Sequence, residues 1–325
     1  MESNNVNQKK HNCTSTLTRR HFLRWSGAAA GGAVLAGNSI SRAFAGPAKT
    51  LTIGNIGWDE DVALSHLTKV VLEEHFDYHV NIVSKTVDGL FSGVANGSID
   101  TFQDVWLPTT HQPEWNKYGN EVVRLPPWYE GRATLGLTVP DYVQAQSIGD
   151  LSVYDSRFHH RIVGIEPGAG EMRIIKNKVM PAYNLNNYKL TSGSTQSMLK
   201  QLGQAINQHQ PIVVALYRPH WAFNVYNLRY LKDPKGAISN LHDRLYTITR
   251  KGLKKDKPEA YAFLDAINLT PSQLGQLELA IQGADNPNQG VRNWLSGNRA
   301  FGANTSVNKQ MIQPWIEAAQ NAAVS

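Results

Sequence analysis

The chain has 325 residues, of which 41% are hydrophobic and 18% charged, a composition typical of a folded globular protein large enough for two domains. Its formal net charge of +6 would suit a nucleic-acid-binding protein. However, six of the 32 basic residues and one of the 26 acidic residues lie in residues 1–45, so the remaining chain holds 26 basic and 25 acidic residues. Nucleic-acid binding therefore loses its main compositional support.

The basic N-terminal segment has the pattern of an export signal. Paired arginines in "TRRHFLRW" precede the apolar stretch "GAAAGGAVLAG", which is too short to span a bilayer permanently. The small-x-small pattern of "AFAG" predicts cleavage after Ala45. The paired arginines indicate the twin-arginine route, so we expect a cleaved signal peptide at residues 1–45 and a soluble, periplasmic mature protein. A disordered basic tail is the alternative.

Cysteine usage and catalytic motifs argue against several kinds of site. Cys13 is the single cysteine and lies upstream of the arginines, so the mature chain would have no disulfide, no cysteine metal ligand and no lipoprotein anchor. The sequence also lacks G-x-S-x-G and H-E-x-x-H, two common catalytic signatures. We therefore expect no metal, no cofactor and no enzymatic activity.

Along the mature chain, strand patterns alternate with helix patterns. Strands are expected at residues 49–56, 79–85, 98–105, 161–165, 188–193 and 211–217, and helices at 60–76, 87–97, 170–180, 195–208, 272–282 and 308–323. Such alternation predicts parallel βαβ units with helices on both faces of a sheet.

Two alternating segments interrupt the βαβ pattern and predict crossovers. The first lies in "PPWYEGRATLGLTVPDYV" and the second in "LHDRLYTITRKGL". We expect two α/β lobes joined by these crossovers, as in a hinged clamshell with its site in the cleft. The expected division is 46–138 for the first part of lobe 1, 139–237 for lobe 2, and 238–325 for the return to lobe 1 with the C-terminal helices.

Three aromatic residues follow apolar strands, where the carboxyl ends of parallel strands line a cleft. They are Trp58 in "NIGWDED", Trp106 in "DVWLPTTH" and Tyr217 in "ALYRPHW". An aromatic cage is the known solution for a quaternary ammonium, and each desolvated ring contributes about 2 kcal/mol. Three unrelated core aromatics are the alternative.

Two further stretches have more than one interpretation. The glycine turn "EPGAGEM" offers backbone N–H groups to a carboxylate or phosphate, although such turns are also common structural joints. His111 could donate to the same anion or lie at the surface. The acids Asp59, Glu60 and Asp61 are expected to charge a helix N-terminus, while a direct role of Glu60 toward a cation stays open.

Six motifs, in order over about residues 50–285, resemble the glycine betaine-binding subunits of ABC importers: "IGWDEDVA", "DVWLPTTH", "PPWYEG", "GIEPGAGEM", "RPHWAFNVYNLRYLKDPKG" and "TRKGLKKDKPEA". The resemblance implies a two-lobed periplasmic-binding-protein clamshell of type II, with parallel-rich sheets flanked by helices. It also implies a cation cage of Trp58, Trp106 and Tyr217, with the ligand carboxylate held by His111 and the amides of Gly170 and Glu171. Residues expected around this site are Glu60, Gly168, Ala169, Arg218, His220, Trp221 and Trp128.

Three residues depart from the family pattern. Tyr217 stands where tryptophan is usual, Arg218 replaces a small residue, and Glu171 replaces an apolar one. A pairing of Arg218 with Glu171 is one expectation, and a site enlarged for proline betaine or carnitine is another. Choline is disfavoured, because His111 and the glycine turn would lack a carboxylate to bind. Trp128 is expected to pack at the crossover and Trp221 to support the Tyr217 loop.

The resemblance implies a monomeric receptor that delivers a quaternary ammonium ligand to an ABC permease and its separate ATPase, without nucleic acid, cofactor or catalysis. Two alternatives stay open. One is a periplasmic enzyme, since the twin-arginine route often exports cofactor proteins. The other is a sensor domain that binds the same ligand but docks on a different partner.

Overall fold

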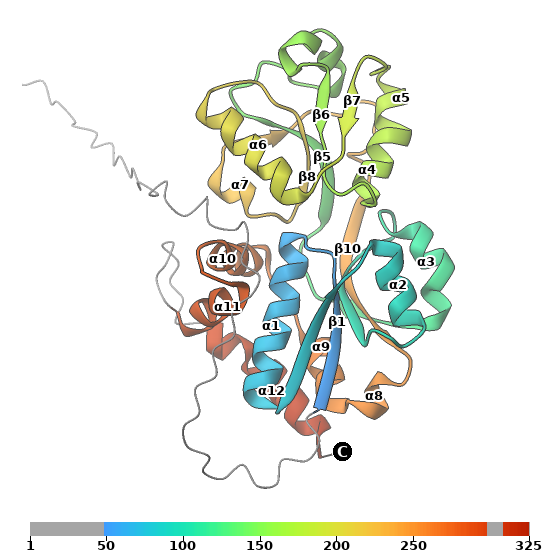
Figure 1. Ribbon diagram of the computed structural model, residues 1–325, viewed down its shortest axis with the longest axis vertical. Helices are drawn as coiled ribbons and strands as arrows, with labels where there is room; N and C mark the ends of the chain where they lie inside the picture. The colour runs from blue at the N-terminus through green and yellow to red at the C-terminus, as the bar shows by residue number, and fades with distance from the viewer. Residues whose placement is uncertain (1–48, 298–307, 325) are drawn as a thin grey trace, which may run out of the picture. The chain divides into compact units, whose positions relative to one another are not determined.

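The computed structural model describes residues 49–297 and 308–324 (Figure 1). The predicted signal peptide, its cleavage site and Cys13 lie outside the described residues. Residues 46–325 form one compact unit. Within the part described, no helix is long and apolar enough to cross a membrane.

The strands follow the predicted order and include two that the sequence patterns did not separate, β4 and β9. Their bounds are β1 Lys49–Asn55, β2 Tyr78–Ser84, β3 Thr101–Leu107, β4 Val122–Pro127, β5 Ala133–Pro140, β6 Arg161–Val163, β7 Lys189–Thr191, β8 Val214–Arg218, β9 Leu228–Tyr230 and β10 His242–Arg250.

The helices lie between and beside these strands. Those of the first half of the chain are α1 Asp59–His75, α2 Val87–Ala95, α3 Gln112–Tyr118, α4 Gly170–Ile174 with its π-helical continuation Ile175–Val179, α5 Met180–Ala182 and α6 Thr195–Asn207. The later ones are α7 Ala222–Val225, α8 Leu253–Asp256, α9 Pro258–Ala266, α10 Pro271–Gln282, α11 Pro287–Ser296 and α12 Asn308–Ala322. Single-turn 3₁₀ segments are Gly119–Glu121, Ile148–Ser152 and Asp155–Phe158.

The strands form a continuous sheet in the order β2-β1-β3-β10-β5-β8-β6-β7, with β4 beside β10 and β9 beside β5. Strand β1 is parallel to β2 and β3, and β6 is parallel to β7 and β8. Strands β5 and β10 run antiparallel to their neighbours. The expected mixed α/β fold with two crossovers is confirmed, and β5 and β10 are the crossover strands.

We call β1–β4 and β10, with their helices, the β1 half, and β5–β9, with theirs, the β8 half. The two halves are joined where β10 pairs with the start of β5, at His242 with Thr134 and Asp243 with Ala133. The expected lobe boundary at 138/139 falls inside β5, and the one at 237/238 falls before β10. The division of the chain into lobes at those positions stays a prediction.

Local sequence explains why the site-bearing elements begin where they do. The turn from β1 into α1 passes through Gly57 at φ +98°, a left-handed conformation that favours glycine. Trp58 follows as the N-terminal flanking residue of α1, and three acids occupy the first turn. All seven residues of β3 are buried, as expected for a parallel strand covered on both faces.

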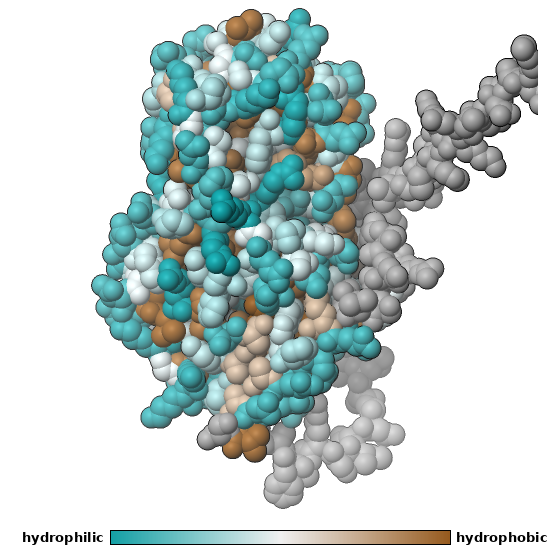
Figure 2. Space-filling model, turned by 180° about the vertical axis from the view of Figure 1, so that it is seen from behind, coloured by the Kyte–Doolittle hydropathy of each residue, from teal (hydrophilic) through white to brown (hydrophobic). Residues whose placement is uncertain are grey.

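Apolar side chains are largely inside the protein. Among the described residues, the exposed large hydrophobic ones are Val153, Val225 and Val324. On the face shown in Figure 2, hydrophilic residues predominate and hydrophobic ones form small separate patches. The aromatic residues of interest, Trp58, Trp106 and Tyr217, are between 2 and 4% exposed, so any site that they form lies within the protein.

Candidate ligand-binding site

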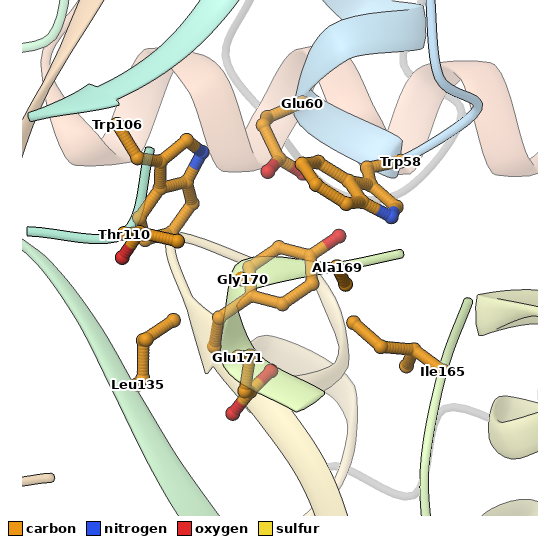
Figure 3. A pocket seen from close by; sticks show the side chains of 10 residues that line it. Trp58, Glu60, Trp106, Thr110, Leu135, Ile165, Ala169, Gly170 and Glu171 are labelled. Atoms are coloured by element: carbon orange, nitrogen blue, oxygen red, sulfur yellow. The ribbon is translucent and has the colours of Figure 1, made fainter. Parts of the chain in front are cut away.

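A narrow cavity brings together the three aromatic residues predicted from the sequence (Figure 3). Its lining comes from both halves of the protein and consists of Trp58, Glu60, Trp106, Thr110, Leu135, Ile165, Ala169, Gly170, Glu171 and Tyr217. Of the ten other residues predicted for the site, four line the cavity: Glu60, Ala169, Gly170 and Glu171.

The three rings stand at steep angles to one another. The ring of Tyr217 lies 5.5 Å from that of Trp106, centroid to centroid, at an interplanar angle of 86°. It lies 6.3 Å from the ring of Trp58 at 55°. Rings in this arrangement direct their faces and edges toward the same cavity. The geometry is suited to surrounding a compact apolar cation.

A hydrogen bond to a residue of the β8 half fixes the orientation of the Trp58 ring. Its Nε1 donates to Glu166 Oε2 at 3.0 Å. Glu166 in turn accepts bonds from the backbone N and hydroxyl of Thr195, at 2.8 and 2.9 Å. The orientation of this ring therefore depends on contact between the β1 half and the start of α6 in the β8 half.

Trp106 is fixed within its own strand. Its Nε1 donates to Asp104 Oδ1 at 2.7 Å, and its backbone is bonded to the loop that follows β3. His111 N donates to Trp106 O at 2.9 Å, and Trp106 N donates to His111 Nδ1 at 3.1 Å. Both indole N–H groups are bonded to carboxyl groups, and one face of Trp58 is stacked on His111, so the opposite face of that ring is the one available to the cavity.

The state of His111 follows from its contacts. Its Nδ1 accepts a hydrogen bond, so the ring proton of the neutral form is on Nε2, and this buried atom has no partner. Burial, with the nearby charge of Arg173, lowers the pKa of His111 to about 3. The imidazole stacks on Trp58, with centroids 6.0 Å apart. His111 is thus a neutral residue stacked on Trp58 and lies outside the cavity wall.

The loop between Trp106 and His111 is held by a residue that the sequence did not reveal. Asp243 of β10 accepts bonds from Thr109 N at 2.6 Å and Thr110 N at 3.0 Å, and also contacts the hydroxyl of Thr110. Thr110 then faces Gly170, where an added Cβ would lie 2.6 Å from Thr110 O. Only glycine permits this approach between the two halves.

Further contacts join the halves around the cavity. Arg173 Nη2 donates to Thr110 O at 2.6 Å, and its Nη1 lies 3.4 Å from Glu114 Oε1. On the other side, Trp221 Nε1 donates to Asp59 Oδ1 at 2.9 Å, and His220 Nε2 lies 3.1 Å from Asp59 Oδ2. The cavity is therefore enclosed by polar contacts between the halves.

The acids of "WDED" were expected to charge the N-terminus of a helix, and the position of Glu60 goes beyond that expectation. It is fully buried, lines the cavity, and neither carboxyl oxygen has a partner. Figure 3 shows its carboxyl group between Trp58 and Trp106. Asp61 is also fully buried, with Ile56 N donating to its Oδ2 at 2.6 Å, and Asp59 contacts His220 and Trp221. The three acids do lie in the first turn of α1, as expected, but Glu60 and Asp61 are fully buried there.

Glu171 lies on the opposite side of the cavity from Glu60 (Figure 3). Its Oε1 accepts from Gly136 N at 3.3 Å, while Oε2 is buried without a partner. Burial raises the pKa of Glu171 to about 8, and the bond from Gly136 partly opposes this. The expected pairing with Arg218 was wrong, because the Arg218 guanidinium lies over the ring of Phe223, 3.6 Å from its centroid.

The remaining predicted residues lie outside the cavity wall. Gly168 is exposed. The ring of His220 lies edge-on to Tyr217, 5.3 Å between centroids. Trp221 contacts α1 through Asp59, and Trp128 is fully buried, with its Nε1 donating to Gln103 O at 2.7 Å. Trp128 and Trp221 therefore support the site from behind, as expected for packing residues.

Sequence reasoning missed three wall residues and the residue that holds Trp58. Leu135 and Ile165 follow ordinary strand patterns, so nothing distinguished them from core residues. Thr110 lies in "DVWLPTTH" next to His111, and Glu166 lies in "GIEPGAGEM" next to the glycine turn. These neighbouring residues were the signal that could have identified them. Among the described residues, no cluster of His, Cys, Asp or Glu is suited to a metal ion.

Comparison with known proteins agrees with this arrangement. The family model described as the substrate-binding domain of ABC-type glycine betaine transport systems matches residues 49–297, and a twin-arginine signal model matches residues 16–36. A glycine betaine/carnitine transport binding protein of Listeria monocytogenes is 33% identical over 168 residues. That match covers 51% of this chain and 53% of the relative, so the chain spans about half the length of this curated relative.

Solved structures cover more of the chain. Lactococcal OpuAC, in a closed form with glycine betaine, is 35% identical with a TM-score of 0.73, over 82% of this chain and 99% of that one. A glycine betaine/L-proline-binding protein from Borrelia burgdorferi is 26% identical with a TM-score of 0.73, over 83% and 100%.

A choline-binding protein of an ABC transporter, in complex with choline, is 22% identical with a TM-score of 0.72, over 85% of this chain and 98% of that one. At that identity the likeness concerns the fold alone. The architecture is that of type II periplasmic binding proteins, and the twin-arginine signal indicates export. With the family match covering most of its length, the chain belongs to the substrate-binding domains of ABC-type glycine betaine transport systems.

Proposed function

We propose that this protein is the exported receptor of an ABC importer and binds glycine betaine or a related trimethylammonium zwitterion. The proposal rests chiefly on one observation: Trp58, Trp106 and Tyr217 line the same buried cavity. Each ring comes from a different point in the chain, and unrelated core aromatics would have no reason to surround a common space.

The cage accounts for most of the affinity that such a receptor needs. A trimethylammonium group has no N–H and cannot be bound by hydrogen bonds, so ring faces are its natural partners. Three desolvated rings contribute about 6 kcal/mol, against the roughly 8 kcal/mol of a micromolar site. The rest must come from the other end of the ligand.

Neutral donors at the other end suit a carboxylate. His111 has an unpartnered, buried Nε2–H, and the backbone amides of Gly170 and Glu171 begin α4 beside Thr110. A carboxylate bound there would satisfy a donor that is otherwise buried at a cost. This is why we favour a zwitterion over choline, which has no carboxylate.

Binding and closure would be coupled because the ligand touches both halves. Trp58 and Trp106 belong to the β1 half, while Tyr217, Gly170 and Glu171 belong to the β8 half. A ligand that contacts both stabilises the form in which they meet. We propose that the halves act as two lobes, with residues 46–138 and 238–325 in one and 139–237 in the other.

The family to which the chain belongs consists of transport proteins rather than enzymes. We extend this to the chain itself: it performs no catalysis, acts as a monomer in the periplasm, and hands its ligand to a permease driven by a separate ATPase.

Calorimetric titration of residues 46–325 with glycine betaine, proline betaine, carnitine and choline tests the proposal. We expect micromolar or tighter binding of glycine betaine, with choline at least about tenfold weaker because one charged hydrogen-bonded contact is lost. Preference for a bulkier betaine would assign the change in specificity to Tyr217 and Glu171. Absence of binding by all four compounds would refute the proposed function.

A further inference from the structure

Three buried acidic side chains lie near enough to affect one another's charge, and we refer to them as the carboxyl cluster: Glu60 of α1, Asp104 of β3 and Glu278 of α10. All three are at most 1% exposed. Glu60 and Glu278 have no partner on either oxygen, and Asp104 has none on Oδ2. Glu60 alone of the three faces the cavity, between the two tryptophans (Figure 3).

No positive group balances this cluster. Within residues 49–297 and 308–324, no lysine or arginine forms an ion pair with Glu60, Asp104 or Glu278. An unpaired carboxylate in a buried position is very costly, and such a group takes up a proton instead. Burial raises the pKa of Glu60 well above its usual range, and the charges of Asp104 and Glu278 raise it further.

The other titratable groups around Glu60 do not change this conclusion. Asp59 and Asp61 share its helix; Asp59 contacts His220, and Asp61 accepts a backbone bond from Ile56. Tyr217 of β8 is buried beside Glu60, and burial raises its pKa well above its usual range, with the charges of Glu60, Asp59 and Asp104 adding to the effect. All of these groups are acidic or neutral, so no positive charge among the described residues around Glu60 compensates it.

A quaternary ammonium in the cage would supply the missing positive charge. Within a desolvated site, a nearby opposite charge strongly favours the ionised form of a carboxyl group. We infer that Glu60 is the counter-ion of the bound ammonium and that it releases a proton when the cation enters, so that ligand binding is coupled to proton release. The inference rests on the proposed function. The O–H bond of Glu60 breaks, the electron pair stays on the carboxylate, and the proton passes to the solvent.

Two groups at the other end of the cavity could exchange protons as well, but not in the same way. His111, with a pKa near 3, stays neutral from pH 5.5 to 7.5. Glu171, with a pKa of about 8, stays protonated at pH 7, and a ligand carboxylate beside it favours that state. Proton release at pH 7 therefore reports on the cage end.

The test is calorimetric titration of residues 46–325 with glycine betaine at pH 7, in buffers of low and high ionisation enthalpy. We expect between about half a proton and one proton to be released per ligand bound. Affinity should then rise between pH 5.5 and 7.5 by up to about tenfold per pH unit, the limit for one proton. Binding without buffer dependence would overturn the inference and leave the proposed function standing, whereas no binding at all would refute both.

Two variants identify the group that releases the proton on binding. Glu60→Gln keeps the shape of the side chain and should bind without proton release, with an affinity that no longer depends on pH in this range. Glu74→Gln, on the same helix but outside the cavity wall, is the matched control and should release as many protons as the wild type. Unchanged release in Glu60→Gln would show that another group is responsible.

A third variant covers the case in which Glu60→Gln fails to bind. Glu278→Gln removes a neighbouring acid without touching the cavity wall, so Glu60 should ionise more easily. We expect its affinity at pH 6 to be about three- to tenfold higher than that of the wild type, and its proton release over the range above pH 6 to be equal or smaller, because Glu60 is then more often ionised before the ligand binds. Lower affinity with unchanged thermal stability would contradict the assignment.

Discussion

The two ends of the cavity differ in what they are made of. The cage end consists of large side chains, Trp58, Trp106 and Tyr217, with the unpaired carboxyl group of Glu60 among them. On the other side, which we call the donor end, the backbone at Gly170 packs against Thr110, and the neutral imidazole of His111 lies outside the cavity wall, stacked on Trp58. We propose that one end attracts positive charge and the other offers hydrogen to an anion, which would suit a zwitterion.

The largest expected effect comes from breaking the cage end. Trp106→Ala removes a central ring whose faces are free because Asp104 holds its Nε1. We expect glycine betaine affinity to fall by at least about 100-fold, since both a cation–π contact and the packing around it are lost. Calorimetry measures this directly. Trp115→Ala, on α3 outside the cavity, is the control and should bind normally; near-wild-type affinity in Trp106→Ala would contradict the cage.

A smaller effect is expected from breaking the donor end. His111→Ala removes the neutral Nε2–H donor. Glycine betaine affinity should fall by about 10- to 30-fold, the value of a hydrogen bond to a charged group. Choline affinity, measured in parallel, should change less than about threefold. Equal losses for both ligands would mean that His111 supports the stacked Trp58 ring instead of binding a carboxylate.

Glu171, which stands where the family has an apolar residue, should make the affinity for glycine betaine depend on pH. Because the pKa of Glu171 is raised to about 8, the group is neutral at pH 7 and becomes charged above pH 8, where it would repel a ligand carboxylate. We expect glycine betaine affinity to weaken by about three- to tenfold between pH 7 and pH 9. Glu171→Gln should abolish this loss, and an identical pH profile in the variant would exclude Glu171 as its source.

The same group should affect folding stability with a definite sign. Its folded pKa is raised, so its protonated form contributes stability that is fully present below the ordinary glutamate range and is lost as pH rises toward about 8. The melting temperature of Glu171→Gln relative to the wild type should therefore increase from pH 5 to pH 9. We expect a difference of about 2–4 °C or more, as 1 kcal/mol produces in a protein of this size. A constant difference across this range would contradict the buried, protonated state.

The smallest effect is expected at the third ring. Tyr217→Trp restores the residue that is usual in the family and enlarges the face offered to the cation. We expect glycine betaine affinity to stay within about threefold of the wild type or to tighten, because tryptophan gives the strongest cation–π contact. A tenfold loss would show that the cavity is shaped for a different ligand.

The sequence predicted the cage end better than the donor end. Trp58, Trp106 and Tyr217 were visible because large aromatics after apolar strands are unusual and lie where parallel strands end. The parallel strands and the two crossover strands were predicted for the same reason, from clear periodic patterns. What the patterns could not show was the environment of each polar side chain.

Burial and pairing depend on residues distant in the chain, and this explains the errors. Glu60 was predicted to charge a helix N-terminus and does lie in the first turn of α1, but its burial and the neighbouring acids from β3 and α10 had no local signal. Arg218 and Glu171 were expected to pair. Instead, the Arg218 guanidinium lies over the ring of Phe223, and the Glu171 carboxyl group accepts a hydrogen bond from Gly136 N. Asp243, which holds the loop before His111, is 132 positions away from it in sequence and had no local signal.

The central claim is that the cage recognises positive charge rather than shape. The most direct measurement compares glycine betaine with 3,3-dimethylbutanoate, which replaces the quaternary nitrogen by carbon and keeps the methyl groups and the carboxylate. We predict that calorimetry will show at least about 100-fold tighter binding of glycine betaine, because three ring faces and Glu60 act on the charge. Equal affinity for the two compounds would contradict the account and leave an apolar pocket without cation recognition.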